Sequence, residues 1–182
     1  MADNILLTEW FPMRVTYQRE LKLKASLDAL GIENFVPMHY EVVGRDDYRK
    51  RALVPAIHNL IFVRTTQKEL TDLKMSRREL SPLRYIMKPT EGKGRMEIIR
   101  VPDRQMENFI RVASVEDERV KFLEYGDFLA QPGKRVKIAD GFFAGVEGVI
   151  KRIKNNKYVV VQIDGVAAVA ITYVPQQSLM AI

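Results

Sequence analysis

The alternation of apolar and polar residues divides the chain into two stretches of different texture. Over residues 1–113 the apolar positions recur at strand and helix spacings in turn, in the order strand, helix, strand, strand, helix, strand, helix. From residue 131 the apolar runs are short and separated by Gly, Pro and Asn, which predicts strands only. We therefore expect an α+β fold, with an antiparallel sheet and flanking helices followed by a small closed β-barrel.

The first stretch opens with a strand predicted over residues 5–15, in which Trp10 and Phe11 supply core area. Pro12 cannot donate to a sheet ladder, so this strand is expected at an edge or with a bulge. The remaining elements are predicted as helices at 18–30, 67–75 and from Pro102 to about residue 113, and strands at 34–43, 60–63 and 83–87. Residues 44–51 are predicted as a hairpin tip or a mobile loop, and residues 88–95 as a loop.

Domain boundaries follow from the same change of texture. We expect one domain over residues 1–113, a partly packed linker over 114–130 and a second domain over 131–182. The second domain has short strands predicted within 134–138, 149–153, 158–163 and 166–173, with a hairpin turn at 154–157.

Charge sharpens this division. The net charge is +6 and the isoelectric point is about 9.5. It is distributed as +5 over residues 1–113, −3 over 114–130 and +4 over 131–182. Two basic blocks separated by an acidic one favour acidic or polyanionic partners for the two domains.

Several classes of function are disfavoured by what the sequence lacks. There is no cysteine, no phosphate-binding glycine motif and no pair of histidines at metal-ligand spacing. We expect no enzymatic activity, cofactor or metal. No apolar run is long enough to cross a bilayer and the first residues are not arranged as a signal peptide, so a cytoplasmic location without membrane contact is expected.

The segment 136–150, VKIADGFFAGVEGVI, resembles a KOW motif. Gly141 and Gly145 are expected at backbone angles that other side chains disfavour. Phe142 or Phe143 is expected to fill the barrel core, and Gly148 to permit a close approach of strands. KOW motifs also occur in ribosomal proteins, so the segment indicates a fold more specifically than a function.

The first stretch resembles the N-terminal domain of the NusG family, called the NGN domain. The resemblance lies in Trp10–Val15, the basic and leucine-rich helix that follows, Phe35-Val36-Pro37, the strand 60–63 and the helix beginning at Pro102. The Pro-Gly pair of the family motif is replaced by His58-Asn59, and its flanking aromatic residues by Ile57 and Leu60. The resemblance covers nearly the whole chain in the correct order.

This resemblance implies partners. NusG-family NGN domains bind the clamp helices of the largest RNA polymerase subunits through an apolar pocket, which suppresses pausing. By position, the corresponding residues here are Ile57, His58, Leu60 and Phe62. Leu60 and Phe62 share one strand face, so the alternative is that both point into the core.

Basic residues suggest a second surface. Contacts with the non-template strand or the upstream DNA duplex are expected from two groups, Arg14, Arg19, Lys22 and Lys24 near the first helix and Arg45, Arg49, Lys50 and Arg51 on the predicted hairpin tip. The alternative is that these side chains only maintain solubility.

For the second domain, the resemblance implies binding of a ribosomal protein or of the termination factor Rho, with Phe142, Phe143 and Ile171 as candidates. The related factor RfaH refolds this domain into helices. We do not expect that here, because residues 158–163 are rich in β-branched side chains.

The start of the first helix and the altered Pro-Gly site resemble specialised paralogues, namely RfaH and the UpxY-like capsule-operon antiterminators. We therefore expect a monomeric, operon-specific antiterminator of polysaccharide genes. One alternative is a general NusG factor that couples polymerase to the ribosome or to Rho. Another is a ribosome-associated KOW protein that binds RNA.

Overall fold

The computed structural model describes residues 7–90, 92, 94–123, 133–153 and 156–182, apart from the side chain of Asp46. It divides into two compact units. The first comprises residues up to Pro37 together with Ile57–Asp103, and the second comprises Met38–Ala56 together with Arg104–Ile182. Residues 38–56 and nearly all of the helix after Pro102 thus belong to the second unit, whereas the boundary predicted from sequence places both before residue 114. The predicted domain limits themselves stay a prediction.

The first unit is built on a four-stranded antiparallel sheet in the order β2-β5-β1-β6. Its strands are β1 (Glu9–Val15), β2 (Glu33–Phe35), β5 (Leu60–Thr65) and β6 (Leu83–Tyr85). The other elements are α1 (Glu20–Ala29), α2 (Gln67–Ser76), the short 3-10 helix η2 (Arg78–Leu80) and the hairpin of β7 (Met87–Pro89) and β8 (Met96–Ile98).

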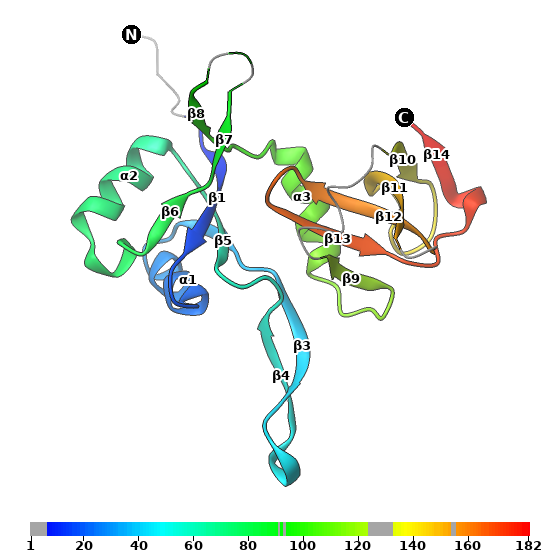
Figure 1. The fold of residues 1–182 in the computed structure, drawn as a ribbon, viewed down its shortest axis with the longest axis horizontal. Coiled ribbons are helices and arrows are strands. Elements are labelled where there is room, and N and C mark those ends of the chain that lie inside the picture. The colour runs from blue at the N-terminus through cyan, green and yellow to red at the C-terminus, as the bar shows by residue number, and fades with distance from the viewer. Residues whose placement is uncertain (1–6, 91, 93, 124–132, 154–155) are drawn as a thin grey trace. The chain divides into compact units, whose positions relative to one another are not determined.

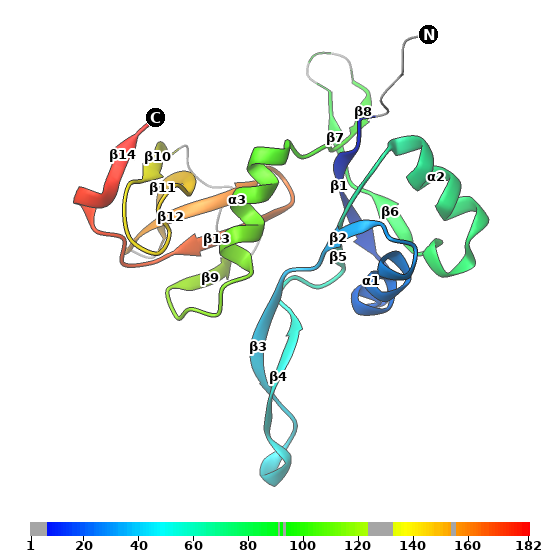
Figure 2. The same ribbon diagram turned by 180° about the vertical axis from the view of Figure 1, so that it is seen from behind.

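Helices α1 and α2 lie on the same side of this sheet (Figures 1 and 2). The Tyr85 ring stands edge-on to Phe11 at 5.9 Å between centroids, and its hydroxyl lies 3.0 Å from the Thr71 hydroxyl of α2. Phe11 is fully buried and Trp10 is 4% exposed. Both residues therefore lie in the core, as predicted.

The prediction that Pro12 lies in an edge strand or at a bulge is wrong, because β1 has neighbouring strands on both sides. The backbone oxygen of Trp10 accepts a hydrogen bond from Val101 on the side away from β5, and the ladder with β6 begins only at Met13. Because backbone groups two residues apart point the same way, the nitrogen of Pro12 faces the gap between these contacts. The proline is accommodated by that gap without a bulge.

Helix α2 begins with a capping arrangement. The Thr66 hydroxyl accepts a hydrogen bond from the backbone N–H of Glu69 at 3.1 Å, and the Glu69 carboxylate returns to bond the Thr65 hydroxyl. These contacts satisfy one of the free N–H groups of the first turn and fix where the helix starts.

Pro37 explains why the strand predicted over residues 34–43 is interrupted. Pro37 lacks an N–H and restricts Val36, so the stretch is divided into β2 and the longer β3 (Met38–Val43). Strand β3 pairs with β4 (Lys50–Pro55) as an antiparallel hairpin whose tip contains the short 3-10 helix η1 (Asp46–Tyr48). The predicted hairpin tip is confirmed. Part of the loop predicted at 88–95 is instead β7 and β8.

The second unit also contains α3 (Asp103–Ala113), except for its first residue, and a six-stranded antiparallel sheet. The sheet order is β14-β10-β11-β12-β13-β9, formed by β9 (Val120–Leu123), β10 (Lys134–Ile138), β11 (Glu147–Ile153), β12 (Asn156–Ile163), β13 (Ala167–Ile171) and β14 (Leu179–Ala181), with η3 (Gln176–Ser178) before the last strand. This order runs from β14 to β9 and does not return on itself within the described residues. Closure into a barrel therefore stays a prediction.

Polar contacts hold α3 to this sheet. Gln105 donates to the backbone oxygen of Gln162 at 2.9 Å, Asn108 accepts from the backbone N–H of Glu147 at 3.2 Å, and Arg104 pairs with the Glu147 carboxylate. Strand β9 lies inside the predicted linker and pairs with β13. The prediction that part of this linker is packed is confirmed for residues 120–123, while 124–130 lie outside the described residues.

The glycine-rich bend between β10 and β11 has the expected geometry. Gly141 and Gly145 have φ of +75° and +87°. A Cβ added to Gly148 would lie 2.8 Å from the backbone oxygen of Val160, so this close strand approach requires glycine. Phe143 is the phenylalanine that enters the core, at 4% exposure. In the described part of the chain, no helix is long and apolar enough to span a membrane.

Candidate nucleic-acid and protein-binding surfaces

The turn that precedes β5 is fastened to the start of α1. Asn59 has a left-handed backbone with φ of +61°, at the position where the family motif has glycine. Its side-chain oxygen accepts from the backbone N–H of Gln18 at 3.0 Å, and its own N–H donates to the buried Glu20 carboxylate. Asn tolerates this conformation better than most residues other than glycine, which is consistent with its occurrence at position 59.

The four residues predicted to contact polymerase divide into two pairs. Ile57 is half-buried and His58 is exposed, so both offer surface. Leu60 is 4% exposed and Phe62 is fully buried. The exposed apolar surface expected at Leu60 and Phe62 is absent, because both side chains point into the core. This is the alternative that followed from their position on one strand face.

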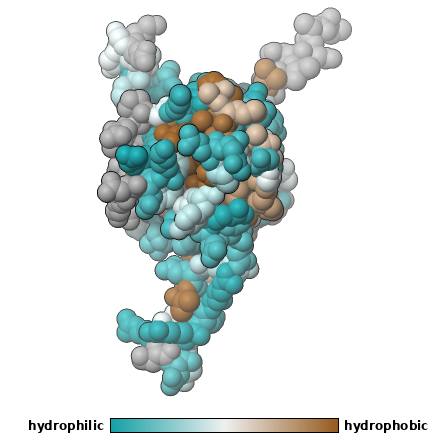
Figure 3. All heavy atoms as spheres, turned by 90° about the vertical axis from the view of Figure 1, so that its right-hand side faces the viewer, coloured by the Kyte–Doolittle hydropathy of each residue, from teal (hydrophilic) through white to brown (hydrophobic). Residues whose placement is uncertain are grey.

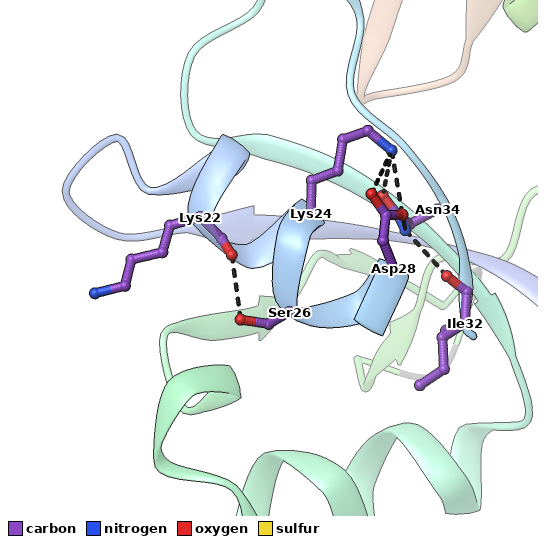
Figure 4. A network of polar contacts seen from close by, with 6 residues as sticks. All are labelled: Lys22, Lys24, Ser26, Asp28, Ile32 and Asn34. Atoms are coloured by element: carbon purple, nitrogen blue, oxygen red, sulfur yellow. Dashed lines mark hydrogen bonds and ion pairs between the residues drawn. The ribbon is translucent and has the colours of Figure 1, made fainter. Parts of the chain in front are cut away.

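Of the four basic residues assigned near the first helix, Lys24 is already partnered. Its ammonium lies 3.2 Å from the Asp28 carboxylate and 3.4 Å from the Asn34 amide oxygen (Figure 4). The hydrogen bond from Asn34, helped by Lys24, holds the pKa of Asp28 below its ordinary value. Lys24 is therefore expected to attract an anionic ligand less strongly than an unpaired lysine does.

Lys22 and Arg19 remain exposed. Figure 4 shows the Lys22 side chain directed away from the Lys24 cluster, while the Lys22 backbone oxygen accepts a hydrogen bond from the Ser26 hydroxyl. Both residues line a surface pocket of about 340 Å³ together with Leu23, Arg78, Glu79 and Pro82. Arg77 lies 3.5 Å from the Glu79 carboxylate and offsets that charge. The pocket is therefore electropositive.

Arg78 is the residue of this pocket that sequence reasoning missed. The signal was the Arg77-Arg78 pair directly after the second predicted helix, but nothing in its spacing places it beside Arg19 and Lys22. Arg14 is separated from these residues. It alternates with Met13, which pairs with Tyr85 on the sheet face that carries α2, so Arg14 lies on the opposite face.

The second basic group lies on the β3–β4 hairpin. Arg45, Arg49 and Lys50 are exposed at or beside the tip. Arg51 pairs with the Glu116 carboxylate, and its guanidinium lies 4.4 Å from the centre of the Tyr40 ring. The hairpin is the lower part of the molecule in Figure 3 and its surface there is mainly hydrophilic. Three of the four basic residues are therefore available to a polyanion.

The residues predicted to bind a partner through the second domain are not equally accessible. Phe142 is 65% exposed, whereas Phe143 and Ile171 are 4% and 1% exposed. The surface expected at Phe143 and Ile171 is absent, because both side chains fill the core of the sheet. Only Phe142 can meet a partner in this conformation.

Beside Phe143, a charged contact fixes the segment that enters β9. Arg119 bonds both Asp117 carboxylate oxygens, and its guanidinium lies 5.1 Å from the centre of the Phe143 ring. Hydrogen bonds from the Arg119 side chain, and then from its backbone N–H, lower the pKa of Asp117 to about 2. The backbone oxygen of Arg119 accepts from the N–H of Thr172 at 2.8 Å.

Among comparisons with known proteins, a family model gives the informative match. A family model described as transcription termination factor NusG matches residues 8–110. A structure entitled "Domain interaction in Thermotoga maritima NusG" has 20% identity and a TM-score of 0.43, covering 96% of this chain and 97% of that one. An MjSpt4:Spt5 complex has 10% identity and a TM-score of 0.27, covering 95% and 96%. At these TM-scores neither likeness supports an argument. No curated protein sequence matches.

The family match extends over more than half of the chain and includes β1, α1, β5, α2 and most of α3. The chain belongs to the NusG family. It is thus a transcription factor of a family that is not enzymatic. Among the described residues, no group of three or more His, Asp or Glu side chains is placed to hold a metal ion.

Proposed function

We propose that this protein binds RNA polymerase during elongation and suppresses pausing and premature termination, acting as an operon-specific antiterminator. The family match over residues 8–110 carries this proposal. The specialised role is supported by His58-Asn59, which replaces the Pro-Gly pair of the family motif. The left-handed turn is retained while the side chains presented to a partner differ.

The polymerase-facing surface is assigned to Ile57 and His58. Of the four residues that match the family's binding strand, these two are accessible. They lie in the turn directly before Asn59. The hydrogen bonds of Asn59 with Gln18 and Glu20 hold this turn in place. A turn fixed in this way presents Ile57 and His58 with little conformational freedom to lose on binding.

DNA contact is assigned to the electropositive pocket of Arg19, Lys22 and Arg78 on the first unit and to Arg45, Arg49 and Lys50 on the hairpin. Phosphate contacts by such residues supply affinity without sequence choice and weaken with salt. We further assign residues 131–182 to a KOW domain, supported by the geometry of Gly141, Gly145 and Gly148, with Phe142 as the residue that meets a ribosomal protein or Rho.

A general termination or elongation factor is the second candidate, because the matching family model is described as a termination factor. Single-round transcription with purified polymerase separates the two. An antiterminator lengthens transcripts past pause sites and terminators on its own operon's leader, whereas a general factor acts equally on unrelated templates and increases termination by Rho.

Co-purification with core RNA polymerase tests the assigned surface. Ile57→Asp combined with His58→Ala is expected to abolish polymerase binding while the protein remains folded. Met75→Asp is a matched control, because Met75 is 83% exposed and belongs to α2, a different element from the turn. Equal polymerase binding by the double variant and the control would refute the assignment of Ile57 and His58.

A further inference from the structure

The tip of the β3–β4 hairpin presents an aromatic ring, with Asp46 and Asp47 directly before it in the chain and basic residues before and after these three. Tyr48 ends η1 and is 87% exposed, the most exposed of the large hydrophobic side chains in the described part of the chain. Arg49 and Lys50 follow it directly, and Arg45 lies at the start of the turn. Exposed single hydrophobic residues are common, so exposure alone indicates nothing.

The backbone of Tyr48 is part of a hydrogen-bonded turn. The backbone N–H of Tyr48 donates to the oxygen of Arg45 at 3.1 Å. Gly44 has φ of +104°, and a Cβ there would lie 2.4 Å from the backbone oxygen of Tyr48. The chain can close this turn only with glycine at position 44. Tyr48 is therefore carried at a defined position on the tip.

The other hairpin tyrosine provides an internal comparison. Tyr40 is 46% exposed and one face of its ring is covered by the guanidinium of Arg51. Among the described residues, no aromatic ring or cation covers Tyr48. Its two faces are open, which is what stacking of a planar ligand requires.

We propose that Tyr48 stacks on an unpaired nucleobase, so that the hairpin tip binds single-stranded nucleic acid in preference to duplex. An accessible aromatic ring beside basic side chains is the combination that binds single strands, in which the cations contact phosphates and the ring contacts a base. A duplex offers phosphates but keeps its bases stacked on one another. This inference rests on the proposed function, because a transcribing polymerase is where the protein would encounter single-stranded DNA. It adds a preference for single strands over duplex, which basic residues alone do not give.

The test uses the full chain and fluorescence anisotropy at low ionic strength, with one end-labelled DNA oligonucleotide offered as a single strand and as its duplex. Tyr48→Ala is expected to weaken single-strand binding roughly tenfold and duplex binding less than about twofold. Tyr48→Phe, which keeps the ring, is expected to bind like the natural protein. Gly44→Ala is expected to lose the single-strand preference because the turn cannot close.

Tyr173→Ala is the matched control, since Tyr173 is 85% exposed elsewhere in the second unit. The proposal is overturned if Tyr48→Ala weakens single-strand and duplex binding to the same extent, or does not weaken single-strand binding. It is also overturned if Tyr48→Phe weakens single-strand binding, or if the natural protein shows no measurable single-strand binding. Polymerase co-purification is measured in parallel. If polymerase is bound while Tyr48→Ala has no effect on DNA, this inference fails and the proposed function stands. If single strands are bound through Tyr48 and polymerase is not bound, this inference stands and the proposed function fails.

Discussion

The buried carboxylate of Glu20 accepts a hydrogen bond from the backbone N–H of Asn59. One residue begins α1 and the other precedes β5, so the contact joins two turns separated by 39 residues of sequence. It lies next to Ile57 and His58, the residues assigned to polymerase. The stability of this turn is therefore linked to the binding surface.

Removal of this acceptor is expected to destabilise the protein. Glu20→Ala leaves the Asn59 N–H without its partner in a partly buried position, at a cost of about 1–3 kcal/mol in the free energy of unfolding. Glu20→Gln retains a side-chain oxygen and is expected to cost less. Urea denaturation measures both. Lys22→Ala, on the exposed side of the same helix, is the control, and an equal effect of Glu20→Ala and Lys22→Ala would contradict this role.

The left-handed turn predicts an order among substitutions of Asn59. Asn59→Ala loses the acceptor for Gln18 and adds strain of roughly 1–2 kcal/mol at positive φ, whereas Asn59→Gly loses only the acceptor. The melting temperature is expected to fall further for alanine than for glycine. If alanine proves as stable as glycine, the backbone conformation is not what selects Asn at this position.

Charge removal at the pocket tests the DNA assignment. Lys22→Gln and Arg78→Gln are each expected to weaken DNA binding and to reduce the slope of log affinity against log salt by about one. Lys68→Gln removes the same charge from a lysine whose ammonium already lies 2.7 Å from the Asp72 carboxylate. That control is expected to leave the slope unchanged, and a slope that responds equally at all three positions would exclude a localised site.

Adjacent phenylalanines are expected to behave differently. Phe143→Ala opens the core of the second sheet and is expected to cost about 3–5 kcal/mol in the free energy of unfolding. Phe142→Ala is expected to stay within about 0.5 kcal/mol of the natural protein, because its ring is mostly in solvent. Reversal of this order in thermal or urea denaturation would place Phe142 in the core.

Acid is expected to weaken the Asp117–Arg119 contact in a defined range. The pKa of Asp117 is about 2 in the folded protein against an ordinary value of 3.8, since hydrogen bonds from Arg119 favour the carboxylate. Its contribution to stability is therefore complete above pH 3.8 and is lost as the pH falls from there through about 2. Urea midpoints measured across this range should show the advantage over Asp117→Asn disappearing. A constant difference would argue against the lowered pKa.

Local signals in the sequence determined much of the fold. Three elements were predicted from local features, namely the leucine spacing of α1, Pro102 before α3 and the apolar run at 60–63. This was possible because helices and strands each impose a characteristic spacing on the residues that share a face. Gly141 and Gly145 showed where a turn needs positive φ. The charge pattern identified basic surfaces, although not which of their residues are partnered.

Contacts between distant segments were decided only by tertiary structure. Leu60 and Phe62 satisfy a strand pattern equally well on either face, and only packing shows that both are buried. Lys24 and Lys22 are two residues apart, yet only Lys24 meets Asn34 from β2. Arg78 reaches the pocket of α1 because η2 packs there. Sequence periodicity specifies which residues share a face, whereas the partner of that face depends on how the chain folds back.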